Sequence, residues 1–311
     1  MKAPAPAFAS APAPLPPAVS GTRFGFDSVA GRLSACVDGV DGGAGHRRTP
    51  LLRVHSVNAA ASAAEVAPLF EHFKTLAPVL APDLPGYGCS ARSDRPYTPR
   101  LMTDAVHAAV QQIQSRFGPG PVDAVGVSLG CEFVARAAAE QPAQFRKLAL
   151  VSPTGFSGKR AWRGAPGSTR AVPGMLKVLR GPGWGGALFR SLTRPGVVRY
   201  FLQRTWGSKA IDEALWRYDV LTARQPGAEF APLTFLSGGL FSADIHTVYG
   251  QLTQPVWVSH GQRGDFTDYR GLVLFAGKSN WHTTVYPTGA LPYFELPQRF
   301  ANDLTAFLAP L

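Results

Sequence analysis

Apolar and polar residues alternate in two short stretches near the start of the chain, and later fall into compact apolar runs separated by segments with helical spacing. The alternation in 23–26 and 32–37 predicts the two strands of a hairpin. The apolar runs predict strands at 51–54, 78–81, 122–125, 147–151, 255–259 and 283–286, and helical spacing predicts helices at about 63–75, 101–117, 133–140 and 298–308. Strands that alternate with helices indicate a mostly parallel α/β sheet flanked by helices, with functional residues at the carboxyl ends of its strands.

One of these strands leads directly into a serine between two glycines. The strand at 122–125 is followed by Gly126-Val127-Ser128-Leu129-Gly130 and then by an alanine-rich helical segment. A Gly/Ser-rich loop could match this pentapeptide by chance, but the order strand, serine, helix is the context of a nucleophile elbow. Glycines on both sides of Ser128 would let the strand and the helix pass close together around a strained turn.

Two segments of the chain depart from the α/β pattern. Residues 1–20 hold prolines at 4, 6, 12, 14, 16 and 17 among alanines, which predicts a disordered extended tail. Residues 156–251 mix arginine, lysine and tryptophan with apolar residues at helical spacing and Gly-Pro turns, as expected for an inserted helical cap. The core is therefore predicted to comprise 21–155 and 252–311.

Charge and cysteine content exclude some classes of partner and binding site. The net charge is +11, most of the excess falls in the predicted cap, and hydrophobic residues make up 45% of the chain. No nucleic-acid-binding module accompanies the charge, so we expect no nucleic-acid partner. Three scattered cysteines fit neither a disulfide framework nor a zinc site, and they are consistent with a cytoplasmic protein. We expect no metal, no cofactor and no transmembrane segment, while the oligomeric state stays open.

Five landmarks in order resemble the α/β-hydrolase fold superfamily. They are His55-Ser56, the loop Asp83 to Ser90, the elbow Gly126 to Gly130, the cap insertion, and the loop Gly261 to Asp265. The resemblance covers nearly the whole chain from Thr22. It implies an α/β-hydrolase sheet with an inserted helical cap.

The resemblance also implies roles for single residues. Ser128 would be the nucleophile, and Asp265 the carboxylate that orients a base, although Asp268 is close enough in sequence to compete. The backbone N–H groups of Leu129 and Val57 would form an oxyanion hole. His55 would lie beside that hole, either close to the substrate or as the structural histidine of the family.

One departure from the family pattern bears on mechanism. The family has a histidine base after its last strand, but this chain reads Gly289-Ala290-Leu291-Pro292, with Ala290 at the histidine position. A serine hydroxyl without a base is a poor nucleophile. Three interpretations follow: an ester hydrolase that recruits its base from His55, Asp265 or water; a lyase- or cyclase-type enzyme; or a degenerate hydrolase that binds a ligand.

The cap also suggests the ligand. Its tryptophans and apolar residues predict an apolar or acyl-bearing small molecule. Its arginines would suit an anionic group on that ligand or peripheral contact with an anionic membrane surface, and they are equally expected of a solvated lid face.

Overall fold

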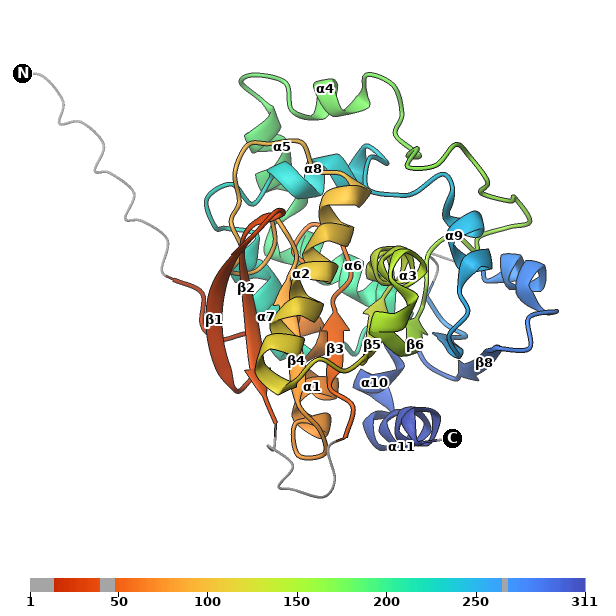
Figure 1. The fold of residues 1–311 in the computed structure, drawn as a ribbon. Helices are drawn as coiled ribbons and strands as arrows, with labels where there is room; N and C mark the ends of the chain where they lie inside the picture. The colour runs from red at the N-terminus through yellow and green to blue at the C-terminus, as the bar shows by residue number, and fades with distance from the viewer. Residues whose placement is uncertain (1–13, 40–47, 265–267, 311) are drawn as a thin grey trace, which may run out of the picture.

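The centre of the protein is one twisted sheet. In a computed structural model, described here for residues 14–39, 48–264 and 268–310, eight strands pair in the order β1-β2-β4-β3-β5-β6-β7-β8 (Figure 1). The strands are β1 (Thr22–Ser28), β2 (Gly31–Asp38), β3 (Leu51–Val54), β4 (Val79–Asp83), β5 (Val122–Val127), β6 (Phe145–Val151), β7 (Val256–Gly261) and β8 (Trp281–Tyr286). β1 pairs antiparallel with β2, and β2 with β4, whereas every other pair is parallel. The predicted hairpin and mostly parallel sheet are confirmed.

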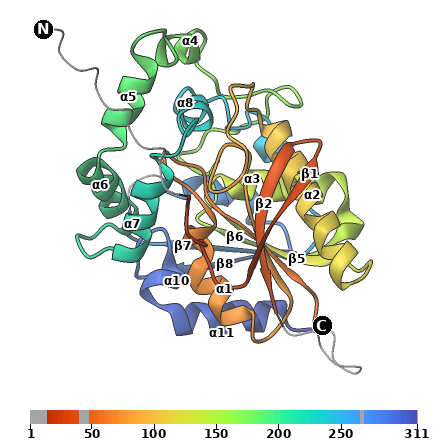
Figure 2. The same ribbon diagram turned by 90° about the vertical axis from the view of Figure 1, so that its left-hand side faces the viewer.

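Helices cover both faces of the sheet (Figure 2). One layer contains α2 (Pro99–Phe117), α3 (Gly130–Glu140) and α9 (Ile245–Gln251), and the other contains α1 (Ala67–Phe73), α10 (Pro292–Glu295) and α11 (Pro297–Leu308). Short 3-10 turns lie at η1 (Ala63–Val66), η2 (Pro142–Gln144) and η3 (Arg270–Phe275). β3 and β5 are buried along their whole length, because each lies between two strands and under helices on both sides.

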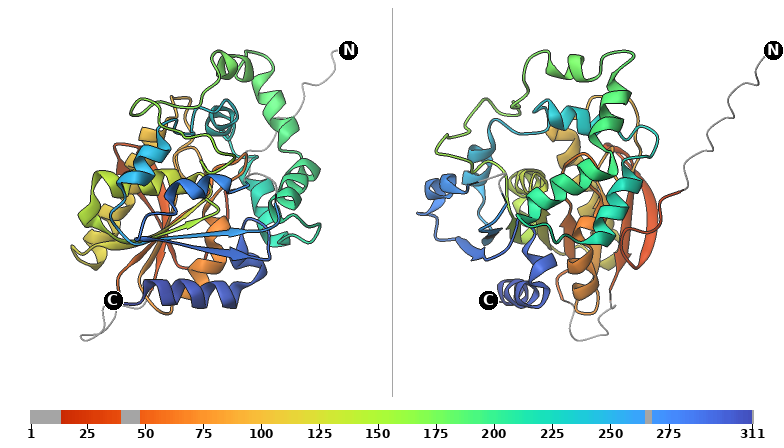
Figure 3. Two further views of the ribbon diagram at one scale, coloured as in Figure 1. Left: turned by 90° about the vertical axis from the view of Figure 1, so that its right-hand side faces the viewer. Right: turned by 180° about the vertical axis from the view of Figure 1, so that it is seen from behind.

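The segment between β6 and β7 is helical, as the sequence predicts. It contains α4 (Met175–Leu179), α5 (Gly185–Leu192), α6 (Pro195–Trp206), α7 (Glu213–Thr222) and α8 (Phe230–Leu236), which gather on one side of the sheet and its flanking helices (Figure 3). The predicted cap boundary at 251 also takes in α9, but α9 packs on α3 within a core layer. This division of the chain into core and cap remains a prediction.

The expected disordered tail needs a correction for its last residues. Residues 1–13 lie outside the described part of the chain, whereas Leu15 and Val19 are buried. The Tyr218 hydroxyl of α7 donates to the Pro16 carbonyl at 2.8 Å. The prolines exclude a helix here, but they do not stop an extended segment from packing on the hairpin and on α7.

Candidate functional site

Ser128 lies on a strained turn at the carboxyl end of β5. Its φ angle is +51°, in the left-handed region that side-chain-bearing residues rarely adopt, and its N–H donates to the Val151 carbonyl of β6 at 2.8 Å. A side chain at Gly126 would meet the Cys131 Cα at 2.9 Å, and one at Gly130 would meet the His55 carbonyl at 2.3 Å. The two glycines therefore let β5, α3 and the end of β3 approach one another around the half-buried serine.

Two backbone N–H groups flank this turn. Leu129 follows Ser128 directly. Val57 comes two residues after His55, whose carbonyl lies against Gly130. Within the described ranges, neither the Leu129 N–H nor the Val57 N–H has a hydrogen-bond partner. Both lie in segments brought together by the close approach of α3 to β3. Unpaired donors beside a serine are the groups that an oxyanion hole requires.

Glu65 holds the loop that carries Val57. Its carboxylate is buried in η1 and accepts from the Ser56 N–H at 2.8 Å and from the Asn58 side-chain amide at 2.6 Å. The Tyr293 hydroxyl donates to the Glu65 carbonyl at 2.9 Å. The role of Glu65 was not predicted from the sequence, although an acidic residue inside an apolar stretch is a usable signal.

A second buried carboxyl group reaches the same region from α7. Asp219 is 2% exposed, and its Oδ1 has no hydrogen-bond partner among the residues that the structure describes. Burial, with a smaller contribution from the Glu65 charge, raises the pKa of Asp219 well above its ordinary value. α7 packs on η1, and the Thr222 hydroxyl donates to the Ala60 carbonyl at 2.8 Å. The predicted cap thus brings a carboxyl group to the loop that Glu65 organises.

His55 has a structural role in the fold. It is fully buried, its Nε2 accepts from the Leu84 N–H at 2.9 Å, and its Nδ1 lies 2.5 Å from the Ser56 carbonyl. Because Nε2 must be the acceptor, Nδ1 carries the proton and donates it to that carbonyl. Both ring nitrogens are therefore used within the fold, which favours the structural histidine among the two roles expected of His55.

The backbone of Ala290, where the resemblance would place the family's histidine, contacts both α6 and the turn after β6. The Ala290 N–H donates to the Thr205 carbonyl of α6 at 2.8 Å, and the Ala290 carbonyl accepts from the Ser152 hydroxyl at 2.5 Å. A side chain at Gly289 would meet the Trp206 backbone at 2.4 Å. The end of α6 thus lies directly on this loop, and the alanine methyl offers no proton acceptor.

Asp265 and Asp268 are the two residues expected to supply the acid of a catalytic triad. Asp265 lies outside the described residues. Asp268 is exposed, accepts from the Gly158 N–H at 2.8 Å, and forms an ion pair with Arg270, whose hydrogen bond lowers the pKa of Asp268 to about 2. An exposed carboxylate paired in this way is a loop contact, and it does not reach a base in the described structure.

His260 is the histidine at the end of β7. Its Nδ1 bonds the Gly261 carbonyl at 3.0 Å, and its ring stacks on Tyr269 with centroids 3.8 Å apart. Its Nε2 has no partner in the part of the chain that the structure describes, and burial lowers the pKa of His260. β6 separates β7 from the strand that carries Ser128, so the two backbones lie about 10 Å apart.

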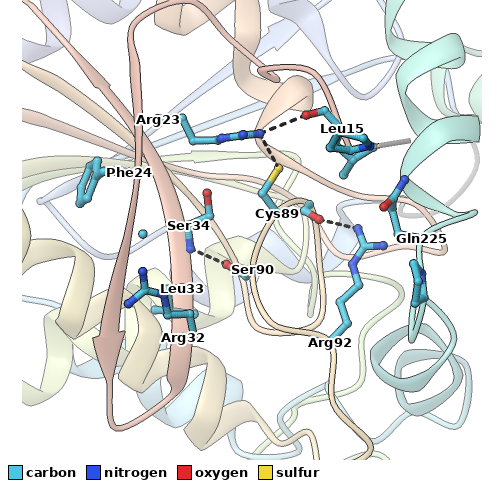
Figure 4. A pocket seen from close by; sticks show the side chains of 14 residues that line it. Leu15, Arg23, Phe24, Arg32, Leu33, Ser34, Cys89, Ser90, Arg92 and Gln225 are labelled. Atoms are coloured by element: carbon cyan, nitrogen blue, oxygen red, sulfur yellow. Dashed lines mark hydrogen bonds between the residues drawn. The ribbon is translucent and has the colours of Figure 1, made fainter. Parts of the chain in front are cut away.

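Two cavities lie near these elements without Ser128 in their lining. One, of about 500 Å³, lies along the β1–β2 hairpin (Figure 4), and the other, of about 460 Å³, lies between the end of α6 and the loop after β7. The described residues contain no group of three histidine, cysteine or acidic side chains placed to hold a metal ion. Nor do they contain a helix of the length and apolar character needed to cross a membrane.

Comparisons with known proteins concern mainly the fold. A sequence model described as "alpha/beta hydrolase fold" matches residues 49–170, and the search of curated proteins found no match. A probable hydrolytic enzyme from Pseudomonas aeruginosa PAO1 is similar with a TM-score of 0.69 and 20% identity, over 97% of this chain and 100% of that one.

Two further solved structures are similar over most of their length. The 2-hydroxy-6-oxo-6-phenylhexa-2,4-dienoate hydrolase from Rhodococcus sp. strain RHA1 has a TM-score of 0.67 and 18% identity, over 93% of this chain and 99% of that one. The enol-lactonase from Burkholderia xenovorans LB400 has a TM-score of 0.67 and 17% identity, over 92% of this chain and 99% of that one. At these identities the likeness is one of fold.

Proposed function

We propose that this chain, which has the α/β-hydrolase fold, hydrolyses an ester or related acyl bond of an apolar small molecule through Ser128. The observation that carries the proposal is the turn at Ser128, with its positive φ and its two tightly approached glycines. Ser152 and Tyr269 also have positive φ, but at Ser128 the strained turn is combined with two glycines that let a strand and a helix approach closely around the side chain. The hydrolases among proteins of similar fold agree with this proposal.

In the proposed reaction, the Ser128 Oγ bonds to the acyl carbon, and the N–H groups of Leu129 and Val57 bind the resulting oxyanion. Each such donor is worth about 3 kcal/mol when it is aimed at the developing charge. Collapse of the intermediate expels the alcohol, which takes up a proton, and water then releases the acid from the serine. Glu65 supports this step from a distance, because it fixes the loop that carries Val57.

The proton of Ser128 needs an acceptor, and the described histidines narrow the choice. His55 has no free ring nitrogen, and Ala290 stands at the family position. Asp265 is one possible acceptor of this proton, and His260 is another. The Nε2 of His260 has no partner among the described residues, and burial lowers the pKa of its ring, which favours the neutral form. The gap of about 10 Å between the two strand backbones is one that an imidazole and a bridging water can span. We therefore include His260 as a base acting through water.

A second candidate function rests on Ala290. Because the end of α6 packs on the loop that would carry the base, the site also suits a protein that binds a ligand or runs a non-hydrolytic reaction without acyl-serine.

Turnover of p-nitrophenyl acyl esters separates the two candidates. The ester hydrolase predicts activity in the parent, loss of at least a thousandfold in Ser128→Ala, and a gain in Ala290→His. An inert parent that becomes active in Ala290→His would instead favour the second candidate. Activity that survives in Ser128→Ala would contradict the assignment of the nucleophile.

A further inference from the structure

The cavity along the β1–β2 hairpin lies where four parts of the chain meet. Its walls come from the residues before β1, the hairpin, the loop after β4, and the loop after α7, and its volume is about 500 Å³ (Figure 4). We propose that this cavity is a binding site for a phosphate monoester, separate from the site at Ser128.

The charge of the cavity is unbalanced. Arg23, Arg32 and Arg92 line it, and no aspartate or glutamate belongs to its lining. Figure 4 shows Arg23 and Arg92 extending from opposite walls, with Cys89 between them. Guanidinium groups that line one cavity without an acid in the lining favour an anionic ligand, because their donors can bind its oxygens.

The existing partners of Arg23 and Arg92 are neutral. Arg23 donates to the Leu15 carbonyl at 3.1 Å and to the Cys89 sulfur at 3.4 Å. Arg92 donates to the Thr222 carbonyl at 2.8 Å and to the Gly88 carbonyl at 2.6 Å, while its buried Nε has no partner among the described residues. Neither arginine forms an ion pair within that part of the chain. The charge of the buried Asp83, which accepts from the Cys89 N–H at 2.8 Å, acts on Arg92 without a direct ion pair. Neither guanidinium is therefore neutralised by a bonded carboxylate.

Arg32 adds a third cation at the hairpin. Its only described acidic partner is Asp27, at 2.9 Å on an exposed surface, where an ion pair is weak. A side chain at Gly25 would lie 3.0 Å from the Arg32 guanidinium, so the glycine leaves room for this group beside the cavity. One guanidinium suffices for a carboxylate, whereas two with a third at the cavity edge suit a doubly charged phosphate.

The remaining walls indicate what the phosphate is attached to. Leu15, Phe24, Leu33 and Pro226 provide apolar surface, and the volume is within the range of small-molecule sites. A ligand with a phosphate group on a small apolar moiety would contact both the arginines and the apolar residues of this cavity. The shared chemistry is a phosphate monoester, whether it comes from a free small molecule or from a lipid headgroup.

The cavity also joins the core to the helical insert. Arg92 bonds the end of α7, and a side chain at Gly227 would meet the Arg92 carbonyl at 2.3 Å. A ligand on Arg92 would therefore stabilise the contact between the loop after β4 and α7. Binding should raise the melting temperature, and the rise should grow with the logarithm of ligand concentration above the dissociation constant.

Calorimetric titration with phenyl phosphate tests the proposal. The parent should bind, and Arg23→Gln and Arg32→Gln should each weaken binding about tenfold, as expected for loss of one charge-assisted contact. Arg190→Gln, which removes an exposed arginine of α5 outside this lining, should bind like the parent. Ser128→Ala should also bind normally, which separates this proposal from the proposed function.

A local readout uses the cysteine in the cavity wall. Cys89 is half-buried, whereas Cys36 and Cys131 are buried, so slow alkylation of the native protein should occur first at Cys89. Phenyl phosphate should slow this alkylation in the parent and in Arg190→Gln. It should protect Cys89 less in Arg23→Gln at the same concentration.

Two arms distinguish the source of the phosphate. Binding of phenyl phosphate without binding to phosphatidic acid vesicles would identify a free phosphorylated small molecule. Binding to these vesicles, absent for phosphatidylcholine vesicles and weakened by Arg23→Gln, would identify a lipid headgroup. The proposal is overturned if the folded parent binds neither probe, or if binding is unchanged in both arginine variants.

Discussion

Replacing Gly130 by alanine should separate the serine turn from the loop after β3. The added Cβ would lie 2.3 Å from the His55 carbonyl oxygen, whereas ordinary contact begins at 3.4 Å, so the two backbones must move apart by about 1 Å. The glycine has no positive φ that would add strain of its own. The substitution therefore changes one spacing, between the elements that carry Leu129 and Val57.

The expected cost follows from that displacement. A misplacement of about 1 Å in a catalytic arrangement costs on the order of a hundredfold in rate, or about 3 kcal/mol. Turnover of a p-nitrophenyl ester and the rate of labelling by a fluorophosphonate should both fall by about this factor in Gly130→Ala. Thermal unfolding shows whether the variant is folded at the assay temperature.

Gly120→Ala is the matched control. It makes the same substitution in the turn before β5, where an added Cβ meets nothing within 4 Å. This variant should keep the parent's turnover and labelling rate. A folded Gly130→Ala protein that also keeps both rates would refute the inference that the close approach of α3 to β3 sets the oxyanion site.

Three further substitutions test neighbouring features. His260→Ala should lower ester turnover about a hundredfold. Because burial lowers the pKa of His260 from its ordinary 6.5, the parent should lose activity only below pH 6.5. A loss that begins above pH 6.5 would contradict the role of His260 as the base. Burial lowers the pKa of Arg53 from 12.5 to about 9, a cost of about 5 kcal/mol in the charged form. Arg53→Met should therefore raise the free energy of unfolding by about 2–4 kcal/mol, once the lost ring contacts with Phe70 and Phe73 are subtracted. This gain should shrink above pH 9, where the buried guanidinium of the parent loses its proton. A gain of equal size in Arg53→Lys, which keeps a charge at this position, would exclude buried charge as the cause. Burial, and then the Glu65 charge, raise the pKa of Asp219, so the stability it contributes is fully present below its ordinary pKa of 3.8 and is lost as pH rises towards the raised value. Asp219→Asn should flatten this decline when urea unfolding is measured at rising pH from 3.8 upward, and an unchanged slope would count against the assignment.

The elbow and the sheet could be predicted because their signals are local. A strand, a serine between glycines and a helix follow one another directly, and the close approaches at Gly126 and Gly130 are the reason that this order needs glycine. The hairpin alternation in β1 and β2 was equally local, and the structure pairs Arg23 with Cys36 across it. The inference that Ala290 takes the place of the family's histidine also rests on its neighbours in sequence, and it stays a prediction.

What the sequence could not predict depends on contacts between distant segments. Glu65 and Asp219 come from η1 and α7, and their approach depends on how the insert folds back on the core. The family pattern placed His55 correctly beside the site, but only the structure shows that the Leu84 N–H occupies its second ring nitrogen. The prolines before β1 signalled an irregular backbone, and they carried no information about the burial of Leu15.

Intact mass after incubation with a fluorophosphonate tests most directly whether Ser128 is an activated nucleophile. The parent should gain one phosphonyl group, and peptide mapping should place it on Ser128, whereas Ser128→Ala should gain none. Gly120→Ala, which leaves the elbow untouched, should label like the parent. A folded parent that stays unlabelled, or a Ser128→Ala variant that labels equally well, would contradict the account.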